Sequence, residues 1–151
     1  MKILTRLKRY KIPYTIQNGN ITINQNINLA NKKSMPDLPD NLTINGEFNL
    51  TNTYIKELPK NFTVNGSLHL VDTFIEKLPD NLTVNGDLNF GSSMMYKIKL
   101  PDNLIVNGQL FPPSLQFEYN KILLYRNRRK KIDSVLNLFE DTNNDFGDTN
   151  T

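Results

Sequence analysis

The sequence contains no cysteine and no tryptophan, and its single histidine is His69. The absence of cysteine excludes disulfide bonds, a thiolate nucleophile and every zinc site that uses cysteine ligands. A metal site built around one histidine would need a cluster of carboxylates, and the sequence shows no such cluster. We therefore expect no catalytic residue, no metal site and no bound cofactor.

Long hydrophobic runs are also missing. No stretch approaches the length of a membrane span, and residues 1–12 alternate apolar and basic side chains without the continuous apolar core of a signal peptide. We expect a soluble, cytoplasmic protein with no membrane partner.

Acidic residues are absent from residues 1–33, which carry seven Lys and Arg. Residues 34–104 have the opposite balance, with five basic and nine acidic residues. A second basic run, Arg126 to Lys131, precedes an acidic tail. The net charge of +3 therefore hides two basic ends, and these are the segments suited to an acidic partner surface or to nucleic acid.

Internal repetition is the strongest pattern in the chain. Four segments begin with Leu-Pro and continue as LPDNLTING, LPKNFTVNG, LPDNLTVNG and LPDNLIVNG, at spacings of 20, 20 and 22 residues. A fifth, degenerate copy, NITINQ, begins at Asn20 and has Gln25 in the glycine position. The two extra residues near Ser93 and Met95 are expected to bulge at one corner.

One unit, residues 58–77, shows how each copy folds. Phe62 alternates with Val64, and Leu68 alternates with Leu70, which is the period of short strands with one buried face. Asn65-Gly66 between them indicates a turn, because glycine adopts positive φ without steric cost. Leu58-Pro59 marks a corner, because proline cannot donate to a strand ladder.

A coil of 20 residues cannot bury its own apolar face, but stacked coils can. The sequence therefore predicts a mostly β fold, a solenoid of about five coils of about 20 residues over residues 20–111, with a helix at each end.

Residues 68–79, LHLVDTFIEKLP, resemble the leucine-rich-repeat pattern L-x-L-x-x-N-x-L-x-x-L-P, with a hydroxyl residue in the asparagine slot. The phrase LPDNLTVNG followed by DLNF resembles uncharacterised repeat proteins encoded by bacteriophages and their hosts. The first resemblance implies that the Leu-x-Leu face binds a partner and that Thr53, Thr73 and Ser93 bond the corner backbone. A plain β-solenoid is the alternative, because the slot lacks asparagine. The 20-residue length and the Leu-Pro corners also resemble the short repeats of bacterial effector proteins. The effector ligases that use such repeats need a catalytic cysteine, so the resemblance does not extend to their activity.

The outward positions of the Leu-x-Leu strands are the candidate protein-binding surface. A rigid sheet with exposed polar side chains can form a contact patch, and the alternative is a solvated face that serves solubility. His69 is interpreted as a surface contact rather than an acid–base residue. The candidate residues are Asn28, Glu47, Asn49, Ser67, His69, Asp87 and Asn89.

The two ends are expected to cap the solenoid or to reach a partner. Residues 1–19 predict a capping helix ended by Pro13 and then a first strand, while residues 112–140 predict a helix and residues 141–151 a disordered tail. The C-terminal helix could also pair with a second copy. Possible basic contacts are Lys8, Arg9, Arg126, Arg128, Arg129, Lys130 and Lys131.

These features favour a protein-binding module without enzymatic activity. The resemblance to phage repeat proteins implies a factor that binds and inhibits a host or defence protein in the host cytoplasm. A virion structural or assembly component is the first alternative. A nucleic-acid-binding accessory protein that uses the basic ends is the second.

Overall fold

The computed structural model describes residues 11–34, 37–92 and 98–144, with side chains up to Leu138. The chain divides into two compact units, Met1–Phe117 and Glu118–Thr151. Several expectations lie outside the described residues: the capping helix in residues 1–10 with Lys8 and Arg9, the bulge near Ser93 and Met95, and the tail from residue 145 onward.

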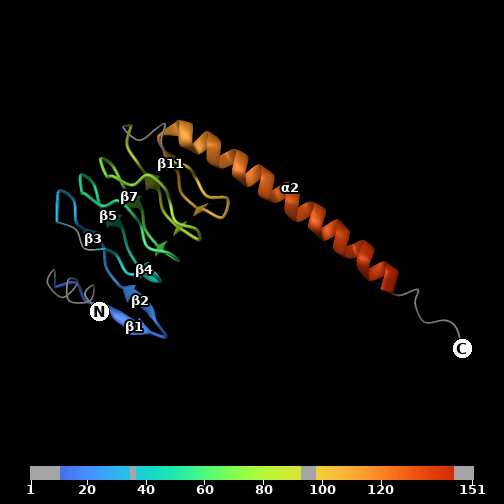
Figure 1. Cartoon of the computed structure of the whole chain (residues 1–151), viewed down its shortest axis with the longest axis horizontal. Coiled ribbons are helices and arrows are strands. Elements are labelled where there is room, and N and C mark those ends of the chain that lie inside the picture. The colour runs from blue at the N-terminus through green and yellow to red at the C-terminus, as the bar shows by residue number, and fades with distance from the viewer. Residues whose placement is uncertain (1–10, 35–36, 93–97, 145–151) are drawn as a thin grey trace, which may run out of the picture. The chain divides into compact units, whose positions relative to one another are not determined.

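The first unit is a β-solenoid in which every coil gives one short strand to each of two sheets (Figure 1). The first sheet contains, in spatial order, β1 (Thr15–Gln17), β2 (Asn20–Ile23), β4 (Leu42–Ile44), β6 (Thr63–Val64), β8 (Thr83–Val84) and β10 (Ile105–Val106). The second contains β11 (Leu110–Phe111), β9 (Leu88–Asn89), β7 (Leu68–His69), β5 (Phe48–Asn49) and β3 (Ile27–Asn28).

Stacking is parallel and in register, so that equivalent repeat positions lie side by side. Thr63 pairs with Thr43 and Thr83 in the first sheet, and Leu68 pairs with Phe48 and Leu88 in the second. The path from β2 through β4, β6 and β8 to β10 makes about four turns. The predicted β-solenoid with a C-terminal helix is thus confirmed, whereas the predicted count of about five coils is not.

The core follows the alternation read from the sequence. Leu68, Leu70, Phe62 and Val64 are fully buried, and Ile75 closes the interior of the same coil from its third side. This third side consists of the segments 53–61, 73–81 and 98–103, which connect the second sheet to the next strand of the first. The predicted corner hydroxyls are confirmed where they are described: Thr53 Oγ1 donates to Leu50 O at 2.7 Å, and Thr73 Oγ1 to Leu70 O at 2.9 Å.

The Asn-Gly turns need glycine for a different reason from the predicted one. Gly66 does not have positive φ. Its N–H donates to Gly46 O at 3.0 Å, and a Cβ on Gly66 would lie 2.6 Å from the carbonyl carbon of Gly46. Glycine is therefore required because successive turns approach too closely for any side chain. Gln25 occupies the same slot in the degenerate first copy, and residues 11–19, the described residues before that copy, contain no further repeat of the motif.

Positive φ is instead found at the corners, where asparagine or aspartate occupies the left-handed region. Asn41, Asn61 and Asn81 have φ of 57°, 52° and 58°, and Asn52 and Asp72 have φ of 55° and 54° at the opposite corner. The asparagine content of the repeat is thus partly a backbone requirement.

Before the first coil, β1 pairs antiparallel with β2 through a two-residue turn. Asn18 and Gly19 form this turn with φ of 50° and 79°, as the favoured hairpin turn requires. The hairpin adds one strand to the N-terminal edge of the first sheet.

The helix α2 (Pro113–Asn144) begins at a proline, which is suited to the first helical turn because its missing N–H has no partner there. Leu115 and Tyr119 near its start are buried. The helix ends at Asn144, four residues beyond the expected end at residue 140. None of the described helices is long and apolar enough to cross a membrane.

The alternation of buried and outward side chains at β7 and the residue after it gives a direct test of the strand register. Leu70→Ala should lower the free energy of unfolding by about 2–5 kcal/mol, because Leu70 is fully buried. The neighbouring His69→Ala change should cost less than about 0.5 kcal/mol, since His69 points outward. Urea unfolding followed by circular dichroism measures both. Equal costs for the two variants would contradict the register.

Candidate protein-binding surfaces

The predicted strand face lies on the outer side of the second sheet, but most of its side chains form hydrogen bonds within the protein. Asn28, Asn49 and Asn89 lie in one row along the second sheet, and each Oδ1 accepts a hydrogen bond from the N–H two residues later. The distances are 3.0 Å to Ala30, 2.9 Å to Thr51 and 2.8 Å to Gly91. The Oδ1 atoms of these asparagines are therefore engaged at the ends of their own strands.

The residues beside this row bond from coil to coil. Ser67 Oγ accepts from the N–H of Asp87 at 3.1 Å, and Asp87 Oδ1 accepts from the N–H of Gln109 at 2.8 Å. In the equivalent bond of the preceding coil, the Glu47 N–H donates to Asn26 Oδ1 at 2.8 Å, and the Glu47 side chain remains exposed. Ser67 and Asp87 thus hold neighbouring coils together.

His69 is the exception in the row. It lies in register between Asn49 and Asn89, half-exposed, and its ring accepts no bond from the backbone two residues later, unlike the asparagines described above and below it. The strand face therefore brings all seven predicted residues onto one surface, of which His69 and Glu47 have side chains without an internal bond.

A second surface, which the sequence analysis missed, lies on the third side. Tyr54 and Phe74 are 54% and 55% exposed, with their rings edge to face at 5.4 Å between centroids. Lys33 Nζ lies 4.6 Å from the centroid of Tyr54 and donates to Asn52 O at 3.1 Å. We call Lys33, Tyr54 and Phe74 the aromatic ridge.

The repeat itself contains the signal for the ridge. Tyr54 and Phe74 occupy the same slot 20 residues apart, directly before the buried Ile55 and Ile75. Alternation places this slot outside the core. The isoleucines were assigned to the core, and the two aromatic rings that precede them were not recognised as part of a surface.

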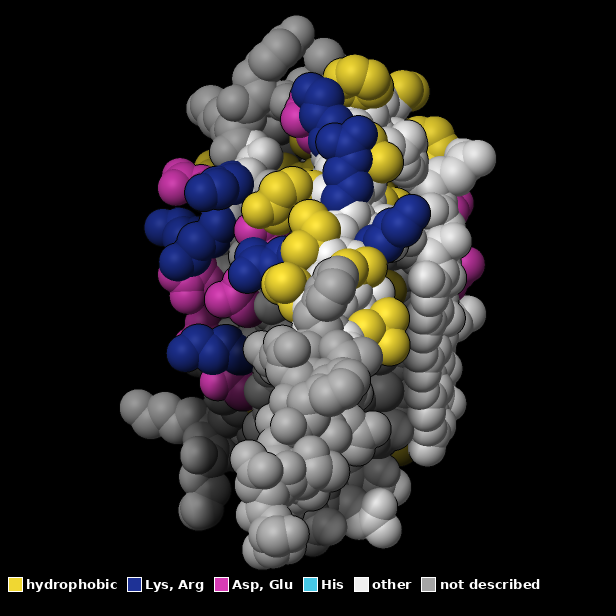
Figure 2. All heavy atoms as spheres, turned by 90° about the vertical axis from the view of Figure 1, so that its right-hand side faces the viewer, with side chains coloured by type: hydrophobic (Ala, Val, Ile, Leu, Met, Phe, Trp, Pro, Cys, Tyr) yellow, Lys and Arg dark blue, Asp and Glu magenta, His cyan; other side chains and the backbone are white. Residues whose placement is uncertain are grey.

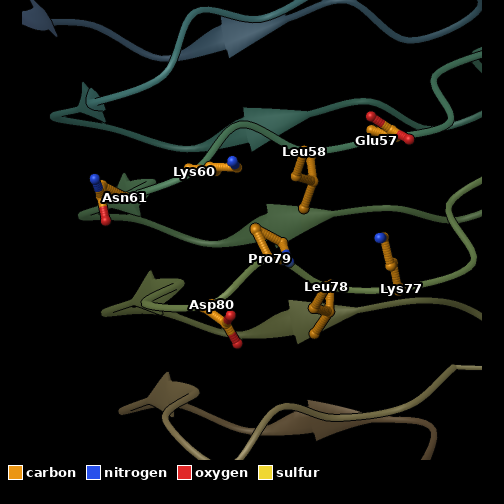
Figure 3. Close-up of a pocket in the computed structure, with 8 residues that line it drawn as sticks. All are labelled: Glu57, Leu58, Lys60, Asn61, Lys77, Leu78, Pro79 and Asp80. Atoms are coloured by element: carbon orange, nitrogen blue, oxygen red, sulfur yellow. The ribbon is translucent and has the colours of Figure 1, made fainter.

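Grooves between successive Leu-Pro corners adjoin the ridge. One groove has Leu58 and Pro79 in its middle, Glu57 and Lys77 at one end, and Lys60 and Asp80 at the other (Figure 3). Another extends from Tyr54 and Ile55 to Pro59. These hollows are shallow, open and lined by side chains of both charges.

Charge alternates between neighbouring coils along these grooves. Lys56 and Glu76 share one repeat position, and Glu57 and Lys77 share the next. All four side chains are exposed, and within the described part of the chain none of them forms an ion pair. Exposed pairs of this kind add little to folding stability, so these charges are available to a partner.

The predicted basic contacts of the second unit lie on α2. Arg128, Arg129, Lys130 and Lys131 are exposed, and Arg126 is half-exposed. At 100° per residue these five positions encircle the helix rather than forming one stripe. On the face of the molecule shown in Figure 2, Lys and Arg side chains lie directly beside hydrophobic ones.

Within the described residues, no three His, Asp or Glu side chains are placed so that they could hold a metal ion. Comparison with known proteins returned no matching protein family, curated protein or solved structure. The candidate surfaces therefore rest on their own geometry.

The asparagine row gives a stability test for the strand face. Asn49→Ala should lower the free energy of unfolding by about 1 kcal/mol, because the Thr51 N–H loses its acceptor. His69→Asn should raise it by a similar amount, because the substitution supplies the bond that the other coils have. Glu47→Ala, on the same face, serves as the neutral control in thermal and urea unfolding. A destabilising His69→Asn would show that His69 has a structural role of its own.

Proposed function

We propose that the chain is a protein-binding module without enzymatic activity and that the aromatic ridge with its adjoining grooves is the contact surface. The exposed edge-to-face pair of Tyr54 and Phe74 carries the proposal. Aromatic side chains are enriched among the residues that contribute most to protein interfaces. The other outward positions on the same side are mainly charged, so the two rings stand apart from their surroundings.

The chemistry of this side favours a protein over a nucleic acid as the partner. Lys56 and Lys77 are balanced by Glu57 and Glu76 on the same side, so the surface has no excess of positive charge. A phosphate backbone would need such an excess. A protein surface with apolar patches and charges of both signs is complementary to it.

The solenoid also holds the ridge rigidly. Phe74 N–H donates to Ile55 O at 3.0 Å, which fixes the spacing between the two aromatic coils. Ile55 and Ile75, next to the two rings, are buried. Little conformational entropy would be lost on binding, because the backbone beneath the rings is already ordered.

A host or defence protein, which the module would inhibit, is the proposed partner. This choice rests on the resemblance between the LPDNLTVNG phrase and phage-encoded repeat proteins.

Nucleic-acid binding is the second candidate function, because five basic residues lie within the six positions 126–131 of α2. Such binding would weaken steeply with salt and would not depend on Tyr54 or Phe74.

Site-specific photocrosslinking distinguishes the aromatic ridge from the strand face as the contact surface. We expect a photoreactive phenylalanine analogue at position 54 or 74 to form an adduct with the same host-lysate protein, and the analogue at position 69 to form none. The double variant Tyr54→Ser/Phe74→Ser should then weaken binding of that protein at least about 30-fold, because two anchor side chains are lost.

His69→Glu, on the second sheet, is the matched control and should leave the affinity unchanged. Circular dichroism of each variant confirms that the coils persist. If the double aromatic variant still binds the host-lysate protein and His69→Glu does not, the binding site lies on the strand face. Capture that is abolished by nuclease would support the nucleic-acid alternative.

A further inference from the structure

We infer that α2 pairs in an antiparallel coiled coil with α2 of a second copy of this chain. The inference does not depend on the proposed function of the solenoid. It rests on the spacing of the apolar residues of the helix, on their exposure and on the charge distribution along the helix.

The spacing is that of a two-helix seam. Ile122, Tyr125, Arg129, Ile132 and Leu136 follow one another at intervals of three, four, three and four residues. These are the a and d positions of a heptad, in which apolar side chains of two helices interlock. Four of the five positions are apolar.

The seam is exposed in the single chain. Tyr125, Ile132 and Leu136 are 63%, 58% and 54% exposed, and Val135 beside them is 44% exposed. A run of exposed apolar side chains over several turns of helix marks an association surface. A matching helix from a second copy would cover the exposed positions Ile132, Val135 and Leu136 with the same residue types.

Charge selects the antiparallel direction. The helix carries five basic residues in positions 126–131, whereas from Ile132 to its end at Asn144 it has three acidic residues and no Lys or Arg. A parallel pair would place the two basic runs side by side. An antiparallel pair staggered about residue 134 places each basic run beside the acidic half of the other copy.

This stagger also aligns the apolar positions. It sets Ile132 of one copy against Leu136 of the other, twice by symmetry, with Val135 flanking the twofold axis. Arg129 then interrupts the seam on both sides of this contact. Asp133, one turn later in the same helix, is positioned to neutralise it, and one polar residue at an a position is a known determinant of register.

The first experiment is sedimentation equilibrium on the full chain. We expect a reversible dimer. Ile132→Lys and Leu136→Lys should each raise its Kd at least about tenfold, because each change removes a buried apolar side chain and introduces a charge. Asn127→Lys adds the same charge off the seam and should leave the Kd within about threefold. A chain that stays monomeric at millimolar concentration would overturn the inference.

The direction is tested by spin-label distances, since a chain without cysteine accepts single labels cleanly. With the helices centred on residue 134 and a rise of 1.5 Å per residue, labels at Asn137→Cys should be separated by about 10 Å along the axis. Labels at Asn120→Cys should be separated by about 40 Å. Equal short distances at both positions would show a parallel pair and overturn the antiparallel assignment.

Discussion

The hydrogen bonding of each coil to an identical coil determines most of what this protein can do. Strands pair with their own repeat position at the usual spacing of about 4.8 Å, so every side chain meets its counterpart from the next coil. Gly66 must lack a Cβ because Gly46 lies directly beneath it. Phe62, Val64 and Leu68 are fully buried because the coils above and below cover them. The residue type that fits a position in such a stack depends on the neighbouring coil as much as on the position within its own coil.

The same constraint limits where function can be located. Polar residues that repeat in several coils, such as Asn28, Asn49 and Asn89, accept a hydrogen bond from the backbone at the end of their own strands. Binding is then most readily supported at positions that depart from the structural pattern. His69 replaces an asparagine, and Tyr54 and Phe74 place exposed rings on a side that is otherwise charged. Departure from the repeat is thus a better guide to a site on this solenoid than membership of an outward-facing row.

Structural features that depend on local sequence patterns could be predicted, and features that depend on distances between coils could not. The two strands per coil and the buried ladders depend on alternation and on the 20-residue period, both of which can be read directly. The reason for Gly66 could not be read, because it depends on the distance between coils rather than on local turn geometry. The roles of Ser67 and Asp87 were missed for the same reason: their hydrogen bonds join residues 20 and 22 positions apart. Tyr54 and Phe74 were readable from their shared slot, but the analysis of the core drew attention to the isoleucines that follow them.

The asparagine stack beside the glycine turns has a chemical consequence. Asn45, Asn65, Asn85 and Asn107 each donate from Nδ2 to Oδ1 of the preceding coil's asparagine at 2.6 Å, so the amides form one chain of uniform direction. Each of these residues is followed by glycine, which lacks the side chain that would hinder attack of its backbone nitrogen on the side-chain amide. Deamidation at one coil would replace a donor with a second acceptor oxygen, facing another acceptor at contact distance. Within this stack, each loss of an amide should therefore open the contact between two coils locally.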